Sequence, residues 1–312
     1  MTETIPQTGR IRIGIAAETG SPPHDVLERA IAGSATGGAR IGAFDDLLHH
    51  DLDGIVLATP GFRADQAKQA LERGIAVYCP RPLGRDAVET RAVIDAARHA
   101  DLLLGVDMAL RQTEAMRVLR STVQAGELGD IYAVELVHHN SLGPPQSSRS
   151  EPIGCMLDSG IVMIDLALWT LGFPRVTDIT SSLYRRGERI SPDNRGVAED
   201  YAAAFFSLDT GATVQLSCSW HLPAGQNARI EASFYGTEGG GALHNVTGSA
   251  TDFTAELFRG SSRHSLSKPR DSWAGRGVVA WADALARGAR YDPWVEGVID
   301  VASTVDRILG KL

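Results

Sequence analysis

The sequence predicts an α/β domain with a parallel sheet, followed by an α+β domain whose open, mostly antiparallel sheet carries helices on one face. In the first third of the chain, short apolar runs alternate with segments of helical periodicity, which is typical of strand–helix–strand units. After Gly129 the apolar runs lengthen, partly alternate with polar residues and are joined by turn-rich segments. A chain of 312 residues exceeds one ordinary core, so we expect two domains, residues 1–126 and 127–312.

The first domain is expected to contain short buried strands. Apolar runs predict strands at residues 11–16, 54–58, 75–79 and 102–106, and helical periodicity predicts helices at 25–32, 64–73, 86–99 and 112–125. Pro80 and Pro82 end the third strand, because proline lacks the amide donor that a ladder or a helix interior needs. Residues 33–53 are glycine-rich. They are too few for a full strand, a helix and their connections, because a crossover alone takes about a dozen residues. We therefore expect a truncated sheet in which the second strand–helix unit is cut down or missing.

The second domain is expected to contain longer strands. Partial alternation predicts strands at residues 131–139, 176–184, 201–208, 213–220 and 228–235, with a helix at 155–171 and a helical tail at 272–311. The polar stretches 143–152 and 248–269 are interpreted as loops that cover a site or contact a partner. Candidates for an exposed apolar face of the sheet are Val214, Leu216 and Phe234.

Composition argues against several classes of function. The net charge of −8 argues against a general nucleic-acid binder, which needs a basic face. No apolar run reaches the length of a membrane span, and residues 1–10 lack the apolar core of a secretory signal. Cys79, Cys155 and Cys218 are odd in number and far apart, which argues against a disulfide scaffold or a cysteine zinc site. We therefore expect a cytoplasmic protein.

Several short motifs follow one another along the chain. They are Ile11-Arg12-Ile13-Gly14-Ile15, Ala58-Thr59-Pro60, Cys79-Pro80-Arg81-Pro82-Leu83, Gly126-Glu127-Leu128-Gly129, Asp158-Ser159-Gly160 with Ile164-Asp165-Leu166, and Tyr235-Gly236-Thr237-Glu238-Gly239. Together these motifs resemble the Gfo/Idh/MocA family, the glucose–fructose oxidoreductase and inositol dehydrogenase group. The resemblance covers nearly the whole chain. It implies a Rossmann-like first domain, here truncated, and a second domain for substrate binding and oligomerisation.

The cofactor loop of that family is altered in this chain. In the family the first strand runs into G-x-G-x-x-G, whose glycines let the backbone approach a pyrophosphate at a helix N-terminus. Ala17, Thr19 and Pro22 stand at the three glycine positions. Pro22 removes an amide donor, and Glu18 adds negative charge where phosphates would lie. We therefore expect no cofactor. If NAD(P) binding is retained in a shifted loop, the expected contacts are Gly20, Thr59, Pro60 and Arg81.

The proton-transfer residues implied by the resemblance are also replaced. The family uses a lysine in the Glu-Lys-Pro turn and a histidine on the long helix, and these positions are Arg81 and Val162 here. Arg81 cannot lose its proton near neutral pH. It can clamp a carboxylate, phosphate or enolate oxygen, and a structural salt bridge is the alternative.

The long helix supplies a candidate that does not depend on the resemblance. Four residues at helical spacing fall on one stripe, namely Asp158, Val162, Asp165 and Trp169. Burial raises the pKa of a carboxyl group, and we interpret Asp158 as a general acid or base. The alternative is that Asp158 caps the helix or bridges to Arg81. For Asp165 we expect a bond to nearby backbone.

Histidines and a tyrosine supply the other candidates. His138 and His139 are adjacent on a strand and face opposite ways, so they cannot hold one metal together, and one of them faces the cavity side. Glu135 and His138 also point to opposite faces of the strand, so no metal is expected. His221 at a strand end and Tyr201 at a strand start are expected to orient a substrate. The alternatives are a surface histidine and a packed aromatic ring.

From these residues we infer a divergent protein that has lost ordinary NAD(P)-dependent hydride transfer. It is expected to perform cofactor-independent acid–base chemistry, of isomerase, lyase or cyclase type, on a small polar or sugar-like carbonyl compound. Asp158 is the general acid or base, Arg81 steadies negative charge, and His221 and Tyr201 orient the substrate. One alternative is a catalytically inert partner subunit in a homo- or hetero-oligomer. The other is an NAD(P)-dependent oxidoreductase with a remodelled cofactor loop.

Overall fold

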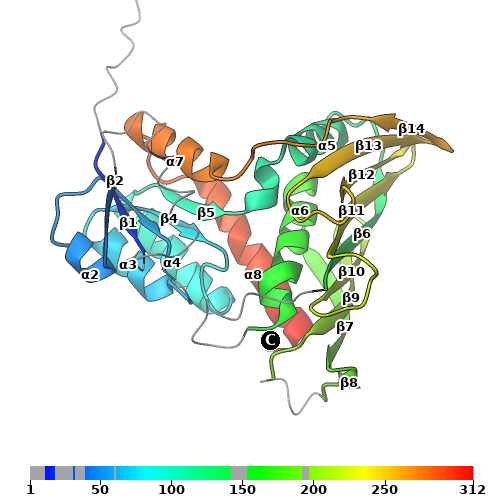
Figure 1. The fold of residues 1–312 in the computed structure, drawn as a ribbon, viewed down its shortest axis with the longest axis horizontal. Coiled ribbons are helices and arrows are strands. Elements are labelled where there is room, and N and C mark those ends of the chain that lie inside the picture. The colour runs from blue at the N-terminus through cyan, green and yellow to red at the C-terminus, as the bar shows by residue number, and fades with distance from the viewer. Residues whose placement is uncertain are drawn as a thin grey trace, which may run out of the picture. The chain divides into compact units, whose positions relative to one another are not determined.

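The chain divides into two compact units (Figure 1). The first comprises Met1–Ala109 and Ala274–Glu296, and the second comprises Leu110–Trp273 and Gly297–Leu312. The computed structural model describes residues 11–17, 31, 39–59, 61–141, 153–191 and 197–311. Each unit is therefore assembled from two separate stretches of the sequence.

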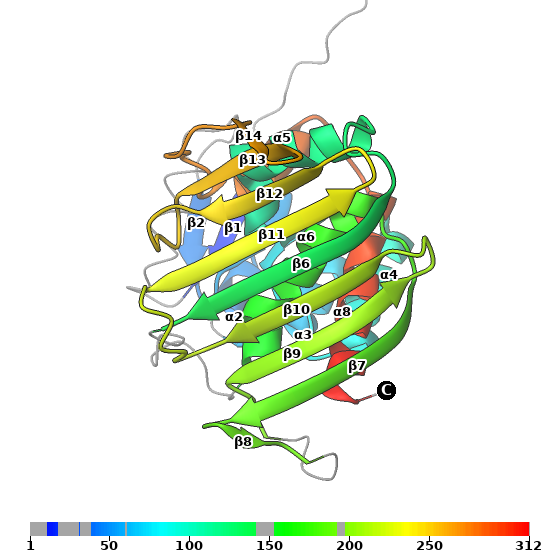
Figure 2. The ribbon, with the colours of Figure 1, turned by 90° about the vertical axis from the view of Figure 1, so that its right-hand side faces the viewer.

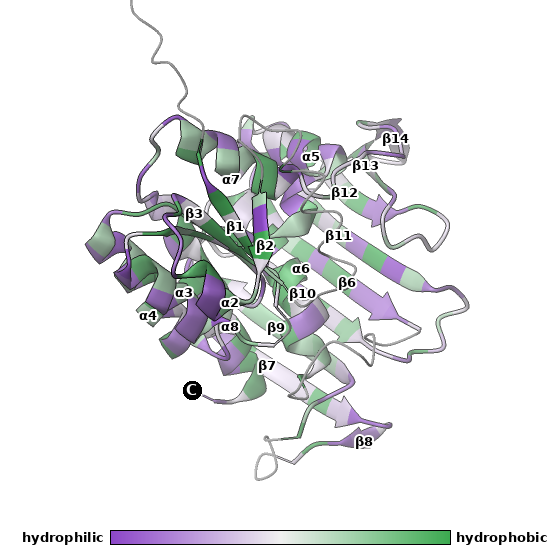
Figure 3. Cartoon of the chain, turned by 60° about the vertical axis from the view of Figure 1, so that its left-hand side comes forward, coloured by the Kyte–Doolittle hydropathy of each residue, from purple (hydrophilic) through white to green (hydrophobic). Residues whose placement is uncertain are grey.

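The first unit contains a five-stranded parallel sheet in the order β2-β1-β3-β4-β5. Its strands are β1 (Ile13–Ala16), β2 (Ala39–Gly42), β3 (Gly54–Leu57), β4 (Ala76–Pro80) and β5 (Leu104–Asp107). Every residue of β1 and β3 is buried, and both strands are largely hydrophobic in Figure 3. Strands of a parallel sheet are apolar on both sides because helices cover both faces. The expected parallel α/β sheet is confirmed.

The glycine-rich region contains a short strand. β2 pairs in parallel with β1, from Ile13 opposite Ala39 to Ala16 opposite Gly42, and the one-turn helix α2 (Phe44–Leu47) follows it. The possibility that this unit is missing altogether is therefore wrong. The expected truncation is confirmed, because the described sheet has five strands and a full dinucleotide fold has six. β2 ends at Gly42, where dinucleotide folds present a carboxylate to the ribose, and the first carboxylates after it, Asp45 and Asp46, lie in the first turn of α2.

Among the described residues of the first unit, three longer helices are α3 (Ala64–Glu72), α4 (Ala87–Ala100) and α7 (Arg276–Ala286). Helix α7 comes from late in the sequence and packs on β3, β4 and β5. The ring of Trp281 on α7 lies 5.7 Å from the ring of Tyr78. A β-carbon added at Gly54 would lie 2.6 Å from the indole, and one added at Gly105 would lie 2.9 Å from it. These two glycines make room for the helix that joins residues 274–296 to this unit.

The second unit contains a nine-stranded sheet in the order β14-β13-β12-β11-β6-β10-β9-β7-β8, seen face-on in Figure 2. Its strands are β6 (Ile131–Asn140), β7 (Val176–Arg185), β8 (Glu188–Arg189), β9 (Tyr201–Leu208), β10 (Thr213–Ser219), β11 (Ala228–Gly236), β12 (Gly240–Asn245), β13 (Phe253–Arg259) and β14 (Ser262–Ser265). Strands β6 and β10 pair in parallel, and the other neighbours pair antiparallel. The expected open, mostly antiparallel sheet is confirmed.

Two expectations about this sheet are wrong. Residues 248–269, interpreted as a loop, contain the β13–β14 hairpin, because the alternating apolar residues that begin with Phe253 fill the core. The residues that were expected to form an exposed apolar face do not form one. Val214, Leu216 and Phe234 are at most 3% exposed and lie in the core, on the face of the sheet that the helices cover.

Helices α5 (Glu114–Gln124), α6 (Ile161–Leu171) and α8 (Gly297–Leu309) lie on one face of this sheet (Figure 2). Helix α6 is apolar and almost entirely buried, since it packs against β6, α5 and α8. The helix expected at 155–171 is confirmed, but its first turn, Met156–Gly160, is π-helical. Among the described residues, no helix combines the length and the apolar character that a membrane span requires.

Candidate active site

A pocket of about 600 Å³ lies in the second unit, at the end of the sheet where β10 finishes and β9 starts. The strand register places Ser219, Tyr201 and Tyr184 side by side on three neighbouring strands at this end. Trp220 and His221, which follow β10, complete much of the wall. The structure therefore brings together two of the predicted site residues, Tyr201 and His221.

Aromatic rings form one side of this pocket. The ring of Tyr201 lies edge-on to Tyr184 with centroids 5.8 Å apart, and it stacks on His139 at 6.2 Å with an interplanar angle of 9°. His139 is buried, and its Nδ1 lies 2.8 Å from Oγ of Ser219. Burial, and then the charge of Arg229, lowers the pKa of His139. His139 therefore stands behind the pocket wall as a neutral ring near neutral pH.

The loop after β10 is held by the start of β9. The carbonyl of Asp200 accepts the amide of Trp220 at 2.7 Å, and the carboxylate of Asp200 accepts the amide of Arg186 at 2.8 Å. His221 has φ +58°, which is uncommon for a residue other than glycine. Non-glycine residues in this region cluster at ligand and active sites. The exposed side chain of His221 lines the rim of the pocket.

Asp158 lies in the π-helical turn before α6 and is half-buried. Its Oδ2 accepts the indole Nε1 of Trp220 at 3.2 Å and Oγ of Ser159 at 3.3 Å. Trp220 thus connects the pocket to the turn that carries Asp158. Single π-helical turns occur frequently at functional sites. Val162, one turn further on, is 3% exposed and has no ionisable group, so it cannot serve as a base.

Close packing and a buried carboxylate hold the π-helical turn. A β-carbon at Gly160 would lie 2.6 Å from Sδ of Met156, so a larger residue would push the turn open. The carboxylate of Glu199 accepts the amide of Met156 at 2.8 Å, and its carbonyl accepts the amide of Cys155 at 2.9 Å. Carboxylates at a helix N-terminus satisfy free amides there. Burial raises the pKa of Glu199.

Asp165 forms a structural ion pair. Its carboxylate is 1% exposed and pairs with Arg111 through both oxygens, with Nε to Oδ2 at 2.7 Å. The guanidinium of Arg111 also lies over the rings of Trp169 and Phe173, at 5.2 Å and 5.6 Å. The partner of Asp165 is therefore a side chain, where nearby backbone was expected. The pair anchors α6 to the segment before α5.

The first unit presents a second group of predicted residues at the carboxyl edge of its parallel sheet. Arg81 follows β4, and its Nε is buried with no hydrogen-bond partner among the described residues. Burial raises the pKa of Asp107 at the end of β5, and the charge of Arg81 opposes this rise. Oγ1 of Thr59, after β3, donates to Gln66 at 2.9 Å. Two other residues named for cofactor contact, Gly20 and Pro60, lie outside the described residues.

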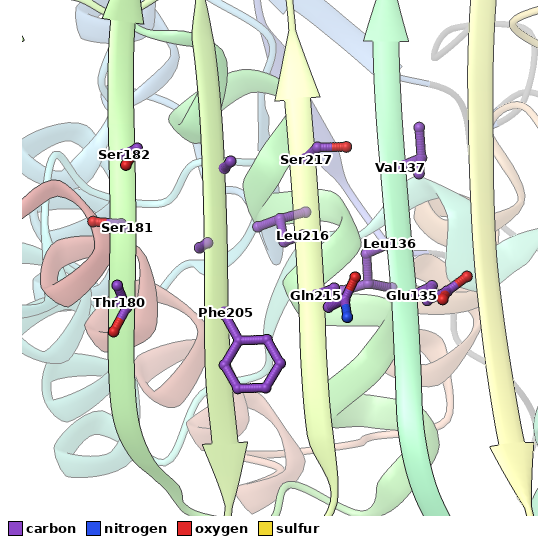
Figure 4. A pocket seen from close by; sticks show the side chains of 12 residues that line it. Glu135, Leu136, Val137, Thr180, Ser181, Ser182, Phe205, Gln215, Leu216 and Ser217 are labelled. Atoms are coloured by element: carbon purple, nitrogen blue, oxygen red, sulfur yellow. The ribbon is translucent and has the colours of Figure 1, made fainter. Parts of the chain in front are cut away.

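The open face of the nine-stranded sheet carries a separate, shallower pocket of about 540 Å³ (Figure 4). Thr180 and Ser182 on β7, Gln215 and Ser217 on β10, and Glu135 on β6 line it with polar groups. Phe205 is the large apolar side chain among them and is 45% exposed. The open face of the sheet is therefore mainly polar around this pocket.

Sequence reasoning missed several residues of the site. Trp220, Ser219 and Glu199 were not singled out, although two of them precede His221 and one lies two positions before Tyr201. Their positions next to His221 and close to Tyr201 in the sequence were the signal that could have identified them. Among the described residues, no group of three His, Cys, Asp or Glu side chains is placed to hold a metal ion.

The first unit has a parallel sheet of the dinucleotide-binding type, and the second unit has an open sheet. In the second unit the carboxylate of Asp158 is bonded to Trp220, which lines the pocket. These features define a two-domain protein with a dinucleotide-type sheet and a separate open-sheet unit. Residues 116–241 match the family described as the GFO/IDH/MocA C-terminal domain. The predicted resemblance to the Gfo/Idh/MocA family is therefore confirmed, and the family match covers residues 116–241 within the second unit.

Individual relatives agree with this family. The rhizopine catabolism protein MocA of Rhizobium meliloti is 27% identical over 53% of this chain, and the match spans 54% of that relative, about half its length. Inositol 2-dehydrogenase of Leifsonia xyli is 26% identical over 88% of this chain and 75% of its own. The solved structure of KijD10, a 3-ketoreductase from Actinomadura kijaniata in complex with TDP-benzene and NADP, has a TM-score of 0.77 and 19% identity, and the match covers 97% of this chain and 98% of that one.

These findings correct the expected function. The relatives and structural neighbours include several dehydrogenases and a ketoreductase, so the expectation of cofactor-independent isomerase, lyase or cyclase chemistry is wrong. The expectation that no cofactor binds is not supported, because structural neighbours include complexes with NADP, NADH and NAD. The interpretation as an inert protein with a degenerate site is not supported either.

Proposed function

We propose that the protein is an NAD(P)-dependent oxidoreductase with a remodelled cofactor loop, which interconverts a hydroxyl and a carbonyl group on a small sugar-like or polyol compound. The observation that supports this most is the position of Asp158. Its carboxylate, in a π-helical turn, accepts the indole N–H of Trp220, and Trp220 lines the aromatic pocket. The curated relatives, which include inositol and xylose dehydrogenases, act on compounds of this kind.

The first unit fits a dinucleotide in part. Ligands of open α/β sheets bind outside the carboxyl ends of the strands, which is where Thr59 and Arg81 lie. The buried Nε of Arg81 without a partner is a donor suited to an anionic or carbonyl oxygen. The last residue of β2, Gly42, carries no carboxylate to favour NAD over NADP, and Asp45 and Asp46 follow on α2. Either cofactor is therefore compatible with the described residues, and Arg81 and Thr59 would hold it.

The bound cofactor supplies hydride transfer. Asp158 accepts the proton of the substrate hydroxyl during oxidation and returns it during reduction, a role worth about 10²–10⁴-fold in rate. The indole N–H of Trp220 orients this carboxylate. Tyr201 and His221 bind the remaining hydroxyls of the substrate from the pocket wall and rim. Arg81 acts in binding.

The test begins with the cofactor. Titration of the full-length protein with NADH and NADPH, followed by fluorescence and calorimetry, is expected to show binding of at least one in the micromolar range. The protein is then assayed with both oxidised cofactors against a panel of cyclic polyols and aldoses, with reduced nicotinamide measured by absorbance. Absence of binding for both cofactors at millimolar concentration would overturn the proposal.

A further inference from the structure

We propose that Glu199 is a positioning residue for Asp158, and that it acts through backbone amides of the π-helical turn in which Asp158 lies. The inference rests on the proposed function, because Asp158 is the proton acceptor in that function. The side chain of Glu199 is only 4% exposed. Glu199 therefore acts on the reaction through the turn and not through contact with a substrate.

Glu199 holds the start of the π-helical turn at two amides. Oε1 of its carboxylate accepts the amide of Met156 at 2.8 Å, and its carbonyl oxygen accepts the amide of Cys155 at 2.9 Å. The first amides of a helix have no partner within the helix, so a partner from outside fixes where the helix begins. Asp158 is two residues after Met156 and belongs to the same turn. A shift of these amides would therefore move Asp158 with them.

The next residue, Asp200, holds the other partner of the Asp158–Trp220 hydrogen bond. The carbonyl of Asp200 accepts the amide of Trp220 at 2.7 Å, and the amide of Asp200 donates to the carbonyl of Tyr184 on β7 at 3.0 Å. The indole of Trp220 then donates to Asp158 at 3.2 Å. Glu199 and Asp200 are consecutive in the chain. One short segment before β9 therefore fixes both the donor and the acceptor of this bond.

Gly154 allows the carboxylate of Glu199 to approach the turn. A β-carbon added at Gly154 would overlap both carboxylate oxygens of Glu199, and Gly154 does not have the positive φ that by itself favours glycine. The glycine is therefore needed for the close approach and not for its backbone conformation. Gly154→Ala should displace the carboxylate from the amide of Met156 without removing the carboxylate from the chain.

Sulfur atoms pack the same turn against β10. Sγ of Cys218 lies 3.7 Å from Sγ of Cys155 and 3.4 Å from Sδ of Met156. Contacts of this kind depend weakly on direction, whereas a hydrogen bond weakens steeply as its angle departs from linear. The sulfur contacts keep the turn on the sheet, and the hydrogen bonds to Glu199 set its orientation.

Kinetics of Glu199 variants test the positioning role. Glu199→Ala is expected to lower kcat by about 10²-fold with KM nearly unchanged, because a misplacement of about 1 Å can cost that much. Glu199→Gln keeps an oxygen that accepts the amide of Met156, so it should retain most of the activity. Glu188→Ala, at an exposed site on β8, is the control and should match wild type. Assays are run well below the lowest melting temperature of the set.

A spectroscopic measurement reports the position of Asp158 without substrate or cofactor. The chain contains five tryptophans, and Trp220→Phe identifies the indole N–H signal of Trp220 in a ¹⁵N–¹H NMR spectrum. Asp158→Ala gives the position of this signal when the hydrogen bond is lost. Glu199→Ala and Gly154→Ala are expected to move the signal toward that position, and Glu199→Gln should leave it near the wild-type position.

Three results would overturn the inference. They are a wild-type Trp220 signal in both Glu199→Ala and Gly154→Ala, a displaced signal with wild-type kcat, and equal loss of kcat in Glu199→Ala and Glu199→Gln. If Glu199→Ala does not fold, which circular dichroism detects, Gly154→Ala and Glu199→Gln decide the question.

Failure of the proposed function is distinguishable from failure of this inference. Absence of NADH and NADPH binding would overturn the proposed function. The Trp220 signal would still decide whether Glu199 holds Asp158 in place.

Discussion

The indole Nε1 of Trp220 donates a hydrogen bond of 3.2 Å to Oδ2 of Asp158. This bond joins the loop after β10, which lines the pocket, to the π-helical turn before α6. The same oxygen also accepts the hydroxyl of Ser159, so the carboxylate is fixed by two donors. A fixed carboxylate is better placed for proton transfer than a mobile one, because less reorganisation is needed at the moment of reaction.

Removal of this bond should lower turnover moderately. Trp220→Phe deletes the donor and keeps an aromatic ring, and we expect kcat to fall about 2- to 10-fold, since such a bond contributes about 0.5–1.5 kcal/mol. Asp158→Asn deletes the proton acceptor and should lower kcat by about 10²–10⁴-fold. Steady-state kinetics with saturating cofactor measures both. Trp294→Phe, at a site 60% exposed in the first unit, is the control. Equal activity of Asp158→Asn and wild type would remove Asp158 from the mechanism.

Arg81 should contribute to cofactor binding. Arg81→Ala is expected to weaken NADH or NADPH binding about tenfold, which corresponds to about 1.4 kcal/mol and is typical of a charge-assisted hydrogen bond. Fluorescence titration measures the Kd. Arg73→Ala, on an exposed part of the same unit, should leave the Kd unchanged. If both variants bind as wild type does, Arg81 has a structural role only.

The buried ion pair of α6 should matter for stability. Asp165→Ala leaves Arg111, whose side chain is 17% exposed, without its carboxylate partner, and we expect the free energy of unfolding to fall by up to about 3–5 kcal/mol. Asp209→Ala removes the partner of Arg175 in an exposed pair with atoms 3.7 Å apart, and it should cost less than about 1 kcal/mol. Urea unfolding followed by circular dichroism compares the two. Similar losses in both variants would contradict the structural role given to Asp165.

Glu199 should make stability depend on pH. Burial raises its folded-state pKa above the ordinary value of 4.5, so the folded protein binds more protons than the unfolded chain between these two values. The stabilising contribution is therefore full below pH 4.5 and is lost as pH rises through the folded pKa. Glu199→Gln is expected to flatten this part of the profile of melting temperature against pH. Glu127→Gln, at an exposed site, should leave the profile unchanged. An unaltered profile in Glu199→Gln would show that this carboxyl is not the source.

The fold class followed from hydrophobic periodicity. The buried residues of β1 and β3 stand in continuous runs, and those of β6 and β10 alternate with polar ones. The hairpin of β13 and β14 was misread because its polar residues outnumber the few apolar ones that fill the core. Glycines in residues 33–38 concealed β2 for a related reason, since a four-residue strand gives little periodic signal.

The sequence by itself determined which residues are chemically able to act. It showed that Arg81 and Val162 cannot be bases, that Asp158 can, and that Tyr201 and His221 flank strands. Only the tertiary structure decided which residues these side chains contact. The fold placed Tyr201 and His221 in one pocket and paired Asp165 with Arg111. It also packed α7 on the first unit through Trp281 and placed His139 between two serines. These contacts join residues far apart in the chain, and distances of that kind arise from strand register and side-chain packing, which local patterns do not encode.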